Sequence, residues 1–461
     1  MMPHHNAYAS AIPLPVYSTD PGVHADLARS ERDRGNGLAA AAHDVAAEAL
    51  VLREDEPARA ALALYNVATG YLMTGDMTSA APWYRLALTL DPELVIAHQN
   101  LAAVCQRLGL YGEAEAHRNA AYSRQRVFVE PCSTAPHRLL LLCTGQEGNI
   151  PFDALVPSHR CHRIKYFIDR AGRAEDHTLP EFDLVFNVIG EPDVAAPLGE
   201  RIREFAERCG RPVLNQPAAV ARCARERLPD LLDGIADVVV APCIRIARPE
   251  GYADGFAARL EDAGIHFPVL VRPIATHGGE GLELHQDLAS LGRTLHHSAQ
   301  PHYLTRFIDT RSADGHYRKY RMIFVDRKPY PYHAAISRGW LVHYFSADML
   351  AHPWKIAEEQ RFLEDPARVL GKRAMAALCA IGMRLDLDFG GIDFTLLADE
   401  RILVFEANAT MLVHYERSDG PLAHKNESVG RIAAAFDALQ KKVVARARAA
   451  GRHARQGCAP G

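Results

Sequence analysis

Residues 390–408 constrain the fold of this chain more than any other stretch. Two apolar runs flank Asp399 and Glu400, a pattern that predicts a β-hairpin. With the turn centred on these two residues, Asp393 lies opposite Glu406, and Asn408 shares a face with Glu406 because strand side chains alternate. The other face is expected to be core and carries Ile392, Phe394, Leu396, Leu403, Phe405 and Ala407. The hairpin therefore predicts one apolar face and one face with two carboxylates and an amide oxygen.

Opposed carboxylates repel each other, so a positive group is expected between Asp393 and Glu406. A hard divalent cation, Mg²⁺ or Mn²⁺, suits oxygen ligands of this kind. The alternative is a solvated acidic face. The nearby amide of Asn408 and the apolar opposite face favour a metal site.

An Asp followed by Glu-x-Asn on the next antiparallel strand resembles the metal-binding strands of the ATP-grasp superfamily. These are ligases such as D-alanine–D-alanine ligase, glutathione synthetase and the RimK-type glutamate ligases. The resemblance implies that Asp393, Glu406 and Asn408 hold Mg²⁺ and that the nucleotide is ATP.

A second part of the resemblance lies upstream. Residues 267–273 read as a strand that enters a glycine-rich turn at 276–281 and returns at 282–285. Glycines let backbone N–H groups approach phosphate oxygens closely. The resemblance implies a phosphate loop here and adenine contacts from the backbone of residues 303–309. The nucleotide-binding candidates are Arg272, His277, Gly278, Gly279, Gly281, Arg306, Phe307, Ile308 and Asp309. Arg272 departs from the family, which often has lysine at this position, and arginine differs from lysine in reach and geometry.

Residues 318–325 predict a strand with Lys319 and Arg321 on one face. The match to RimK-like ligases places a transition-state arginine near Arg321, so Lys319 and Arg321 are the catalytic candidates. A basic, solvated edge strand is the alternative. Arg338, His343 and Tyr344 either contact the acceptor substrate or pack within a loop. The sequence favours these two interpretations equally.

An internal repeat marks the N-terminal part of the chain. Residues 61–68 align with residues 95–102 at an offset of 34. The same offset matches Gly75 with Gly109, Ala80 with Ala114 and Ala87 with Ala121. Period and small-residue positions resemble the tetratricopeptide repeat, and residues 38–57 look like a degenerate third helix pair. A generic helical bundle is the alternative. Such an array either binds a peptide or protein partner or braces the catalytic part.

From residue 138, short apolar strands alternate with helices, which predicts a parallel sheet. In the resembled family this is the small domain that precedes ATP-grasp. Gly145 and Gly148 form either a phosphate-binding turn or an ordinary one. The expected fold is multidomain: all-α tetratricopeptide-like helical repeats, an α/β pre-ATP-grasp domain and an α+β ATP-grasp domain. The expected segments are a disordered 1–34, repeats over 35–127, the pre-ATP-grasp domain over 128–217, ATP-grasp over 218–445 and a disordered basic tail over 446–461.

Composition limits the partners and the compartment. The formal net charge of −4 gives no global basic field for nucleic acid or an anionic membrane. Nine cysteines without a CxxC pair fit reduced thiols in the cytoplasm better than a disulfide framework. No apolar run approaches the roughly 20 residues of a membrane span, and residues 1–20 lack a signal-peptide pattern.

Together these features predict an ATP- and Mg²⁺-dependent carboxylate–amine ligase that acts through an acyl phosphate. A carboxylate would be the substrate, with a peptide or an amino acid recruited by the repeats as one option. Catalysis would rest on positioning and electrostatics, since no nucleophilic side chain is required. Two alternatives remain open: a small-molecule kinase on the same fold, and a non-catalytic nucleotide-binding scaffold whose repeats bind a peptide.

Overall fold

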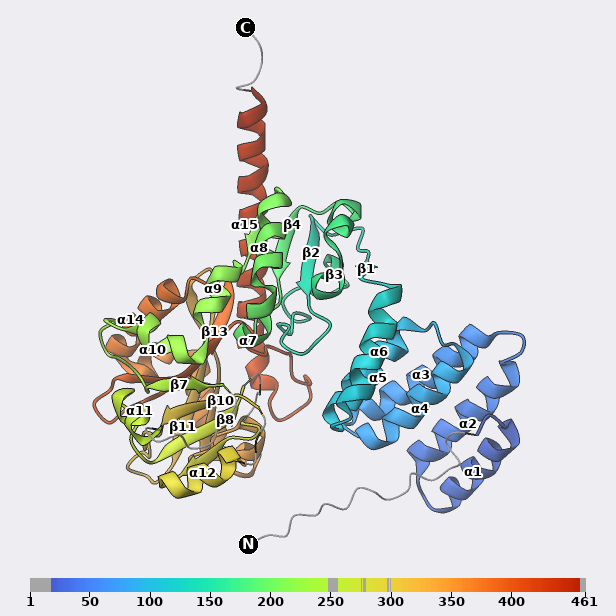
Figure 1. The fold of residues 1–461 in the computed structure, drawn as a ribbon, viewed down its shortest axis with the longest axis horizontal. Helices are drawn as coiled ribbons and strands as arrows, with labels where there is room; N and C mark the ends of the chain where they lie inside the picture. Colours follow the sequence, from blue (N-terminus) through green and yellow to red (C-terminus); the bar gives the residue numbers. More distant parts are fainter. Residues whose placement is uncertain are drawn as a thin grey trace. The chain divides into compact units, whose positions relative to one another are not determined.

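A computed structural model describes residues 18–247, 256–274, 276, 279–296, 298 and 300–456. The chain divides into two compact units, Met1–Arg126 and Val127–Gly461 (Figure 1). Among the described helices, none is both long enough and apolar enough to cross a bilayer.

The described part of the first unit consists of helices that pair in chain order, α1 with α2, α3 with α4 and α5 with α6. Their bounds are α1 (Pro21–Asp33), α2 (Gly37–Leu52), α3 (Pro57–Met73), α4 (Met77–Leu90), α5 (Val95–Arg107) and α6 (Tyr111–Arg124). Gly75 and Gly109, matched by the repeat offset, both connect two paired helices with positive φ, at 83° and 76°. Glycine adopts this conformation without steric cost. The two matched glycines therefore have the same structural role, a turn between paired helices. The tetratricopeptide assignment stays a prediction.

Residues 21–33 form helix α1, in contrast to the disorder expected for residues 1–34. The Asp20 carboxylate accepts a hydrogen bond from the Gly22 N–H at 2.8 Å and caps the helix, and Pro21 suits its first turn. The helix buries His24 and Ala28, so it lacks the apolar periodicity that predicts an amphipathic helix. The first helix pair thus spans residues 21–52 and not 38–57, and residues 1–17 lie outside the described residues.

Two histidine pairs join helices in the first and third pairs. Nδ1 of His24 in α1 lies 2.9 Å from Nδ1 of His43 in α2. Nδ1 of His98 in α5 lies 2.9 Å from Nδ1 of His117 in α6. Such a contact needs one nitrogen to donate and the other to accept, so each pair requires at least one neutral imidazole.

The second unit begins with a small sheet of strand order β1-β3-β2-β4-β5. Its strands are β1 (Val127–Glu130), β2 (Arg138–Cys143), β3 (His162–Phe167), β4 (Leu184–Asn187) and β5 (Val213–Leu214), and its helices are α7 (Pro192–Ala195), α8 (Gly199–Arg208) and α9 (Pro217–Arg222). β2, β3, β4 and β5 pair in parallel, as the alternation of strands and helices predicts, and β1 is antiparallel to β3.

A second sheet, of order β7-β10-β8-β9, is antiparallel throughout. It comprises β7 (Cys243–Ile246), β8 (Val269–Pro273), β9 (Glu283–His285) and β10 (His302–Arg306), with helices α11 (Phe256–Asp262) and α12 (Leu288–His296). Leu260 of α11 and Leu291 of α12 pack with Val269 and Leu304 in a separate small core. We call this part the lobe.

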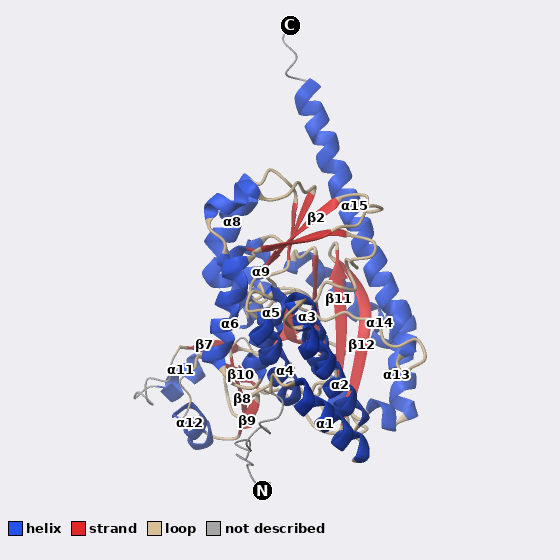
Figure 2. Ribbon diagram, turned by 90° about the vertical axis from the view of Figure 1, so that its right-hand side faces the viewer, coloured by secondary structure: helices blue, strands red, loops and turns tan. Residues whose placement is uncertain are grey.

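The central sheet has the order β12-β11-β13-β14-β6. Its strands are β6 (Val238–Val240), β11 (Tyr317–Val325), β12 (Lys328–Ser337), β13 (Phe389–Leu396) and β14 (Ile402–Asn408), and the helices around it are α10 (Leu228–Leu232), α13 (Pro353–Glu364), α14 (Pro366–Leu385) and α15 (Asn426–Gln456). Helices α13 and α14 pack against β12 (Figure 2).

Helix α15 continues to residue 456, whereas disorder was expected from residue 446. Alanine and arginine, both strong helix formers, occupy every position of residues 445–450. Residues 457–461 lie outside the described residues.

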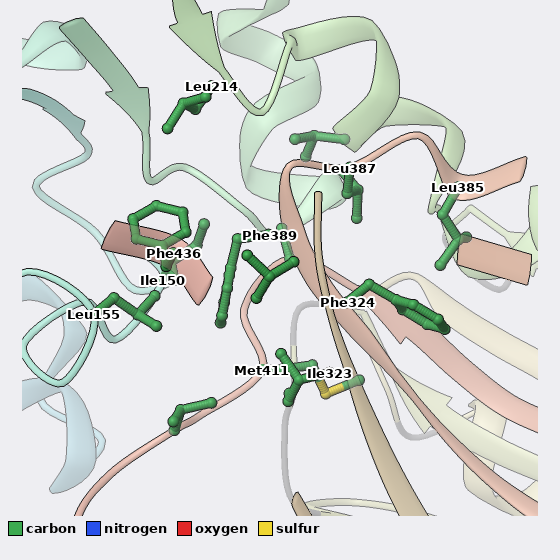
Figure 3. Packing of buried hydrophobic residues seen from close by; sticks show 14 of the residues in the cluster. Ile150, Leu155, Leu214, Ile323, Phe324, Leu385, Leu387, Phe389, Met411 and Phe436 are labelled. Atoms are coloured by element: carbon green, nitrogen blue, oxygen red, sulfur yellow. The ribbon is translucent and has the colours of Figure 1, made fainter. Parts of the chain in front are cut away.

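One hydrophobic core joins the small sheet to the central sheet (Figure 3). The ring of Phe436 in α15 lies 4.9 Å from that of Phe186 in β4 and 5.9 Å from that of Phe389 in β13. The loop after β4 also meets the loop after β14. A Cβ on Gly190 would lie 3.0 Å from Cβ of Ala409, closer than ordinary packing allows.

The glycines at the start of the hairpin allow neighbouring strands to approach β13. A Cβ on Gly391 would lie 2.7 Å from the backbone oxygen of Met322 in β11, and one on Gly390 would lie 3.0 Å from that of Asn408 in β14. Any side chain here would push apart the strands that carry the candidate site.

Candidate active site

The predicted hairpin is present, and Asp393 is paired with Glu406 in its register. The turn differs from the expected one, because Leu396 pairs with Ile402 and the register shifts between Asp393 and Phe394. The turn is thus centred half a residue earlier than expected. One extra residue in β14 makes up the difference and keeps Asp393 opposite Glu406. Such a bulge is common next to active sites, where it re-aims side chains.

The bulge changes the expected core face. Leu403 pairs with Thr395, which places it on the same face as Asp393. It lines a cavity but is buried, with 2% of its surface exposed, as the core assignment predicts. Phe405 also lines the cavity and is 41% exposed, so its assignment to the core was wrong.

Asp393 is buried and pairs with two cationic side chains of the neighbouring strand. Arg321 binds it through two hydrogen bonds, Nε to Oδ1 at 2.6 Å and a terminal nitrogen to Oδ2 at 2.9 Å. Nζ of Lys319 lies 3.1 Å from Oδ2. Burial opposes ionisation of this carboxyl, but Arg321 and Lys319 outweigh it and hold the pKa of Asp393 well below its usual range.

Glu406 is bound by an arginine that the sequence did not single out. Arg225, in the short 3₁₀ helix Arg225–Arg227, donates from its guanidinium to Oε2 of Glu406, and Arg272 of β8 lies 3.9 Å from the same oxygen. Burial raises the pKa of Glu406 and Arg225 lowers it, with a net lowering. Nothing in the local sequence marks Arg225, because its role arises from a contact between segments 181 residues apart.

The site carries more positive than negative charge. Four cationic side chains, Arg225, Arg272, Lys319 and Arg321, surround two carboxylates. Burial and the neighbouring Arg225 lower the pKa of Arg272 to about 10. Crowded, desolvated guanidinium groups are stabilised by an anion, so the cluster is suited to bind phosphate.

A cavity of about 210 Å³ gathers most of the predicted residues. It is lined by Arg272, Gly279, Arg306, Phe307, Ile308, Lys319, Arg321, Asp393 and Glu406. Aromatic and apolar side chains form another part of the wall, with the Phe307 and Trp340 rings 5.8 Å apart in an edge-to-face arrangement. The cavity wall thus combines cations and carboxylates with apolar rings.

Three predicted residues take structural roles beside the cavity, among the parts that the structure describes. Gly281 has a φ of 64°, and a Cβ there would lie 2.9 Å from Cδ of Pro273. The Asp309 carboxylate accepts from the Arg311 N–H at 3.0 Å. The Asn408 amide oxygen accepts from the Thr410 hydroxyl at 3.1 Å. His277 and Gly278 lie outside the described residues.

The other loop candidates differ in whether they line the cavity. His343 lines the cavity, whereas the Tyr344 hydroxyl donates to the buried Glu359 at 2.8 Å. Gly148 accepts backbone hydrogen bonds from Gly190 and its successor, so it serves a turn between two loops. A larger hollow of about 1030 Å³, between residues 151–161 and α15, holds none of the predicted residues.

The donor chemistry at the hairpin fits Mg²⁺. Asp393 and Glu406 offer carboxylate oxygens on directly facing strand positions, and Asn408, two residues beyond Glu406, offers an amide oxygen. Across the described residues, no three His, Cys, Asp or Glu side chains form a metal-binding group. Mg²⁺ does not require one, because it uses one or two carboxylates together with water and substrate phosphates.

No protein-family model matches the sequence, and no curated protein matches it. Among solved structures, the D-alanine–D-alanine ligase of Bacillus anthracis complexed with ATP is 14% identical, with 68% of this chain and 98% of that chain covered and a TM-score of 0.42. The RimK domain protein ATP-grasp of Sphaerobacter thermophilus is 16% identical, with coverages of 65% and 98% and a TM-score of 0.40. The D-alanine–D-alanine ligase of Coxiella burnetii is 10% identical, with coverages of 69% and 98% and a TM-score of 0.43.

Proposed function

We propose that the second unit is an ATP- and Mg²⁺-dependent ligase that joins a carboxylate to an amine through an acyl phosphate. The observation that carries this proposal is a cavity lined by four cations, by the two carboxylates that they pair with, and by apolar rings. The cations suit a polyphosphate, the carboxylates suit its metal, and the apolar wall suits a purine.

In this proposal Arg272 and Arg225 hold phosphate oxygens, and Lys319 and Arg321 stabilise charge on the transferring phosphoryl group. Asp393, Glu406 and Asn408 would hold Mg²⁺, which supplies charge neutralisation at the phosphates when bound. The substrate carboxylate attacks the terminal phosphorus and ADP leaves. The amine then attacks the acyl carbon, and inorganic phosphate and a proton leave. The chain contributes position and electrostatic stabilisation, and no covalent bond to a side chain is needed.

The ion pairs of the site favour this division of roles. Arg321 and Lys319 are held by the Asp393 carboxylate, which fixes their positions before any ligand arrives. Preorganised charges contribute most to stabilising a transition state, because they need no reorganisation during the reaction.

The helical unit completes the proposal as the part that recruits a peptide or amino-acid substrate. Its support is the repeated helix-pair plan together with exposed apolar side chains on several helices, among them Leu62 at 44%, Met73 at 85% and Tyr111 at 61%.

Calorimetric titration of Mg–ATP tests the nucleotide part. Arg272→Ala should weaken binding because it removes a ground-state phosphate contact, while Arg321→Ala should lower kcat more than it weakens binding, by about 10²–10³. Arg203→Ala, in an exposed ion pair on α8, is the matched control. Hydroxylamine trapping then separates an acyl phosphate from the phosphate ester that a kinase would make. Parent-like binding and turnover in both variants would refute the site.

A further inference from the structure

Asp193 in α7 connects the small-sheet part of the second unit to the lobe. The Tyr303 hydroxyl of β10 donates to both carboxylate oxygens of Asp193, at 2.9 and 3.0 Å. A terminal nitrogen of Arg245 in β7 lies 3.0 Å from Oδ1 of the same carboxylate, and the Asp193 side chain is only 5% exposed. Because a buried charge without partners is costly, this carboxylate favours the arrangement in which the lobe lies against it.

The residues that bind Asp193 belong to one row across the lobe sheet. Tyr303 lies directly opposite Arg245 on one neighbouring strand and directly opposite Arg272 on the other. Directly opposed residues share a face of a sheet, so these three side chains form a row. Tyr303 and Arg272 both line the cavity. Asp193 therefore holds one end of a row whose other end is Arg272.

The lobe is separate from the main hydrophobic core. Its buried side chains, among them Leu260, Val269 and Leu304, form a core of their own. Parts of a chain that do not share an apolar core move relative to each other unless other contacts hold them. The place of Arg272, 3.9 Å from the Glu406 carboxylate, thus depends on contacts such as that of Asp193.

A local role in α7 does not account for this arrangement. An acidic side chain in the first turn of a helix interacts favourably with the helix dipole, but α7 has only four residues. The Asp193 carboxylate is instead bound by side chains of the lobe. Burial, then the charge of Asp193, raises the pKa of Tyr303, so its hydroxyl keeps the proton that it donates.

We infer that Asp193 is a positioning residue for the nucleotide, which docks the lobe through Tyr303 and Arg245 so that Arg272 faces the phosphates beside Glu406. This inference rests on the proposed function, which assigns Arg272 to phosphate oxygens. Asp193 does not line the cavity, so it acts through the row that it holds. Without this contact the lobe is docked in only a fraction of the molecules, and the apparent affinity for the nucleotide falls by that fraction.

Calorimetric titration of Mg–ATP with Asp193→Ala in the full chain is the first test. Binding should weaken by about tenfold, as expected for lost hydrogen bonds to a charged group. In an Arg272→Ala background the same change should have a much smaller effect, because the side chain that Asp193 positions is gone. Independent destabilisation would instead give additive losses.

Asp176→Ala is the matched control. The Asp176 carboxylate also accepts from a tyrosine hydroxyl, that of Tyr166 at 2.7 Å, and pairs with an arginine, Arg201 at 2.6 Å. Its side chain is 9% exposed, and both partners belong to the small-sheet part, in β3 and α8. D176A should lower the melting temperature as D193A does but keep the parent's affinity for Mg–ATP.

A second readout needs no nucleotide. Cys243 stands two residues before Arg245 in β7, so it shares the face of the lobe sheet against which Asp193 lies. Labelling with iodoacetamide, followed by mass spectrometry, measures how fast each cysteine reacts. Cys243 should react faster in D193A than in the parent, whereas the buried Cys223 after α9 should react at the parent's rate.

Arg245→Ala keeps the test decisive if D193A does not fold. The Arg245 side chain is 40% exposed, so its removal leaves the core intact. R245A removes the ion pair but leaves the Tyr303 hydroxyl bound to Asp193. It should therefore show the same two changes, in Mg–ATP affinity and in Cys243 labelling, at smaller size.

The outcomes are distinct. Parent-like Mg–ATP affinity in the folded variants would overturn the inference, as would losses that add to that of Arg272→Ala or an equal loss in D176A. An unchanged rate of Cys243 labelling would overturn the docking of the lobe by Asp193. If the parent itself does not bind Mg–ATP, the proposed function fails, and the labelling rate alone then decides whether Asp193 docks the lobe.

Discussion

Arg225 and Glu406 form an ion pair between a short 3₁₀ helix and the second strand of the hairpin, 181 residues apart in the chain. Arg225→Ala should leave the Glu406 carboxylate without its main partner and destabilise the protein by about 1–3 kcal/mol. The double variant Arg225→Ala/Glu406→Gln should recover much of this loss, because the unpaired charge is gone. Urea denaturation of the single and double variants measures the coupling. Simple additivity of the two changes would show that the pair is not coupled.

Glu406→Gln should abolish Mg²⁺-dependent turnover and leave the fold intact. Glutamine has nearly the same shape but lacks the charge that a cation requires, and the core lies on the other face of the hairpin. Phosphate release measured across a Mg²⁺ series, with circular dichroism as the folding control, checks this. Wild-type turnover in the variant would remove Glu406 from the metal site.

Gly391→Ala should destabilise the protein by about 1–3 kcal/mol through overpacking, because its Cβ would meet the Met322 backbone oxygen at 2.7 Å. Gly199→Ala is the matched control, since nothing lies within 4 Å of a Cβ there and the residue is helical. The control should gain up to about 1 kcal/mol from helix propensity. Thermal melts of both variants decide the comparison, and equal effects would contradict the close approach of β11 to β13.

The histidine pairs predict acid sensitivity of the first unit. Burial lowers the pKa of His24, His43 and His117 in the folded state. The unfolded chain therefore binds protons more readily, so stability is complete above the ordinary histidine value of about 6.5 and is lost as the pH falls through it. Each histidine that stays unprotonated in the folded state lowers the free energy of unfolding by up to about 1.4 kcal/mol for each pH unit below this value.

Melting temperatures between pH 8 and pH 5 measure this loss. His43→Asn offers an amide N–H to His24 and removes one titrating ring, so its melting temperature should fall less steeply with acid. His159→Asn replaces an exposed histidine and serves as the control. Identical slopes in all three proteins would show that the pairs do not control acid stability.

Residues 127–461 should bind Mg–ATP without the helical unit, because they form a compact unit with their own core. If the helices recruit a peptide substrate, the truncated protein should show a higher KM for that substrate and an unchanged ATP affinity. An insoluble truncated protein would instead support the bracing role.

The sequence predicted local features of the site and missed those that depend on long-range contacts. Alternation along two strands was enough to pair Asp393 with Glu406. The bulge that moves Phe405 into the cavity wall leaves no mark in the alternation. Arg225 reaches Glu406 from a segment that carries no motif, so only the folded chain brings these two residues together.

Helix α1 shows a different limit of prediction from the sequence. Its buried positions are His24 and Ala28, and neither gives the apolar signal on which helix prediction relies. The partner of His24 is His43 in the next helix, so the evidence for the helix lies in a contact and not in its own periodicity.

The absence of a side chain at Gly190 has a consequence for motion. With room for only a hydrogen atom between the loop after β4 and the loop after β14, we expect the small sheet and the hairpin to resist sliding past each other. The Phe436 ring, which contacts Phe186 and Phe389, supports the same expectation. We therefore expect any opening or closing of the cavity to come from the lobe, which has its own small core and carries Arg272.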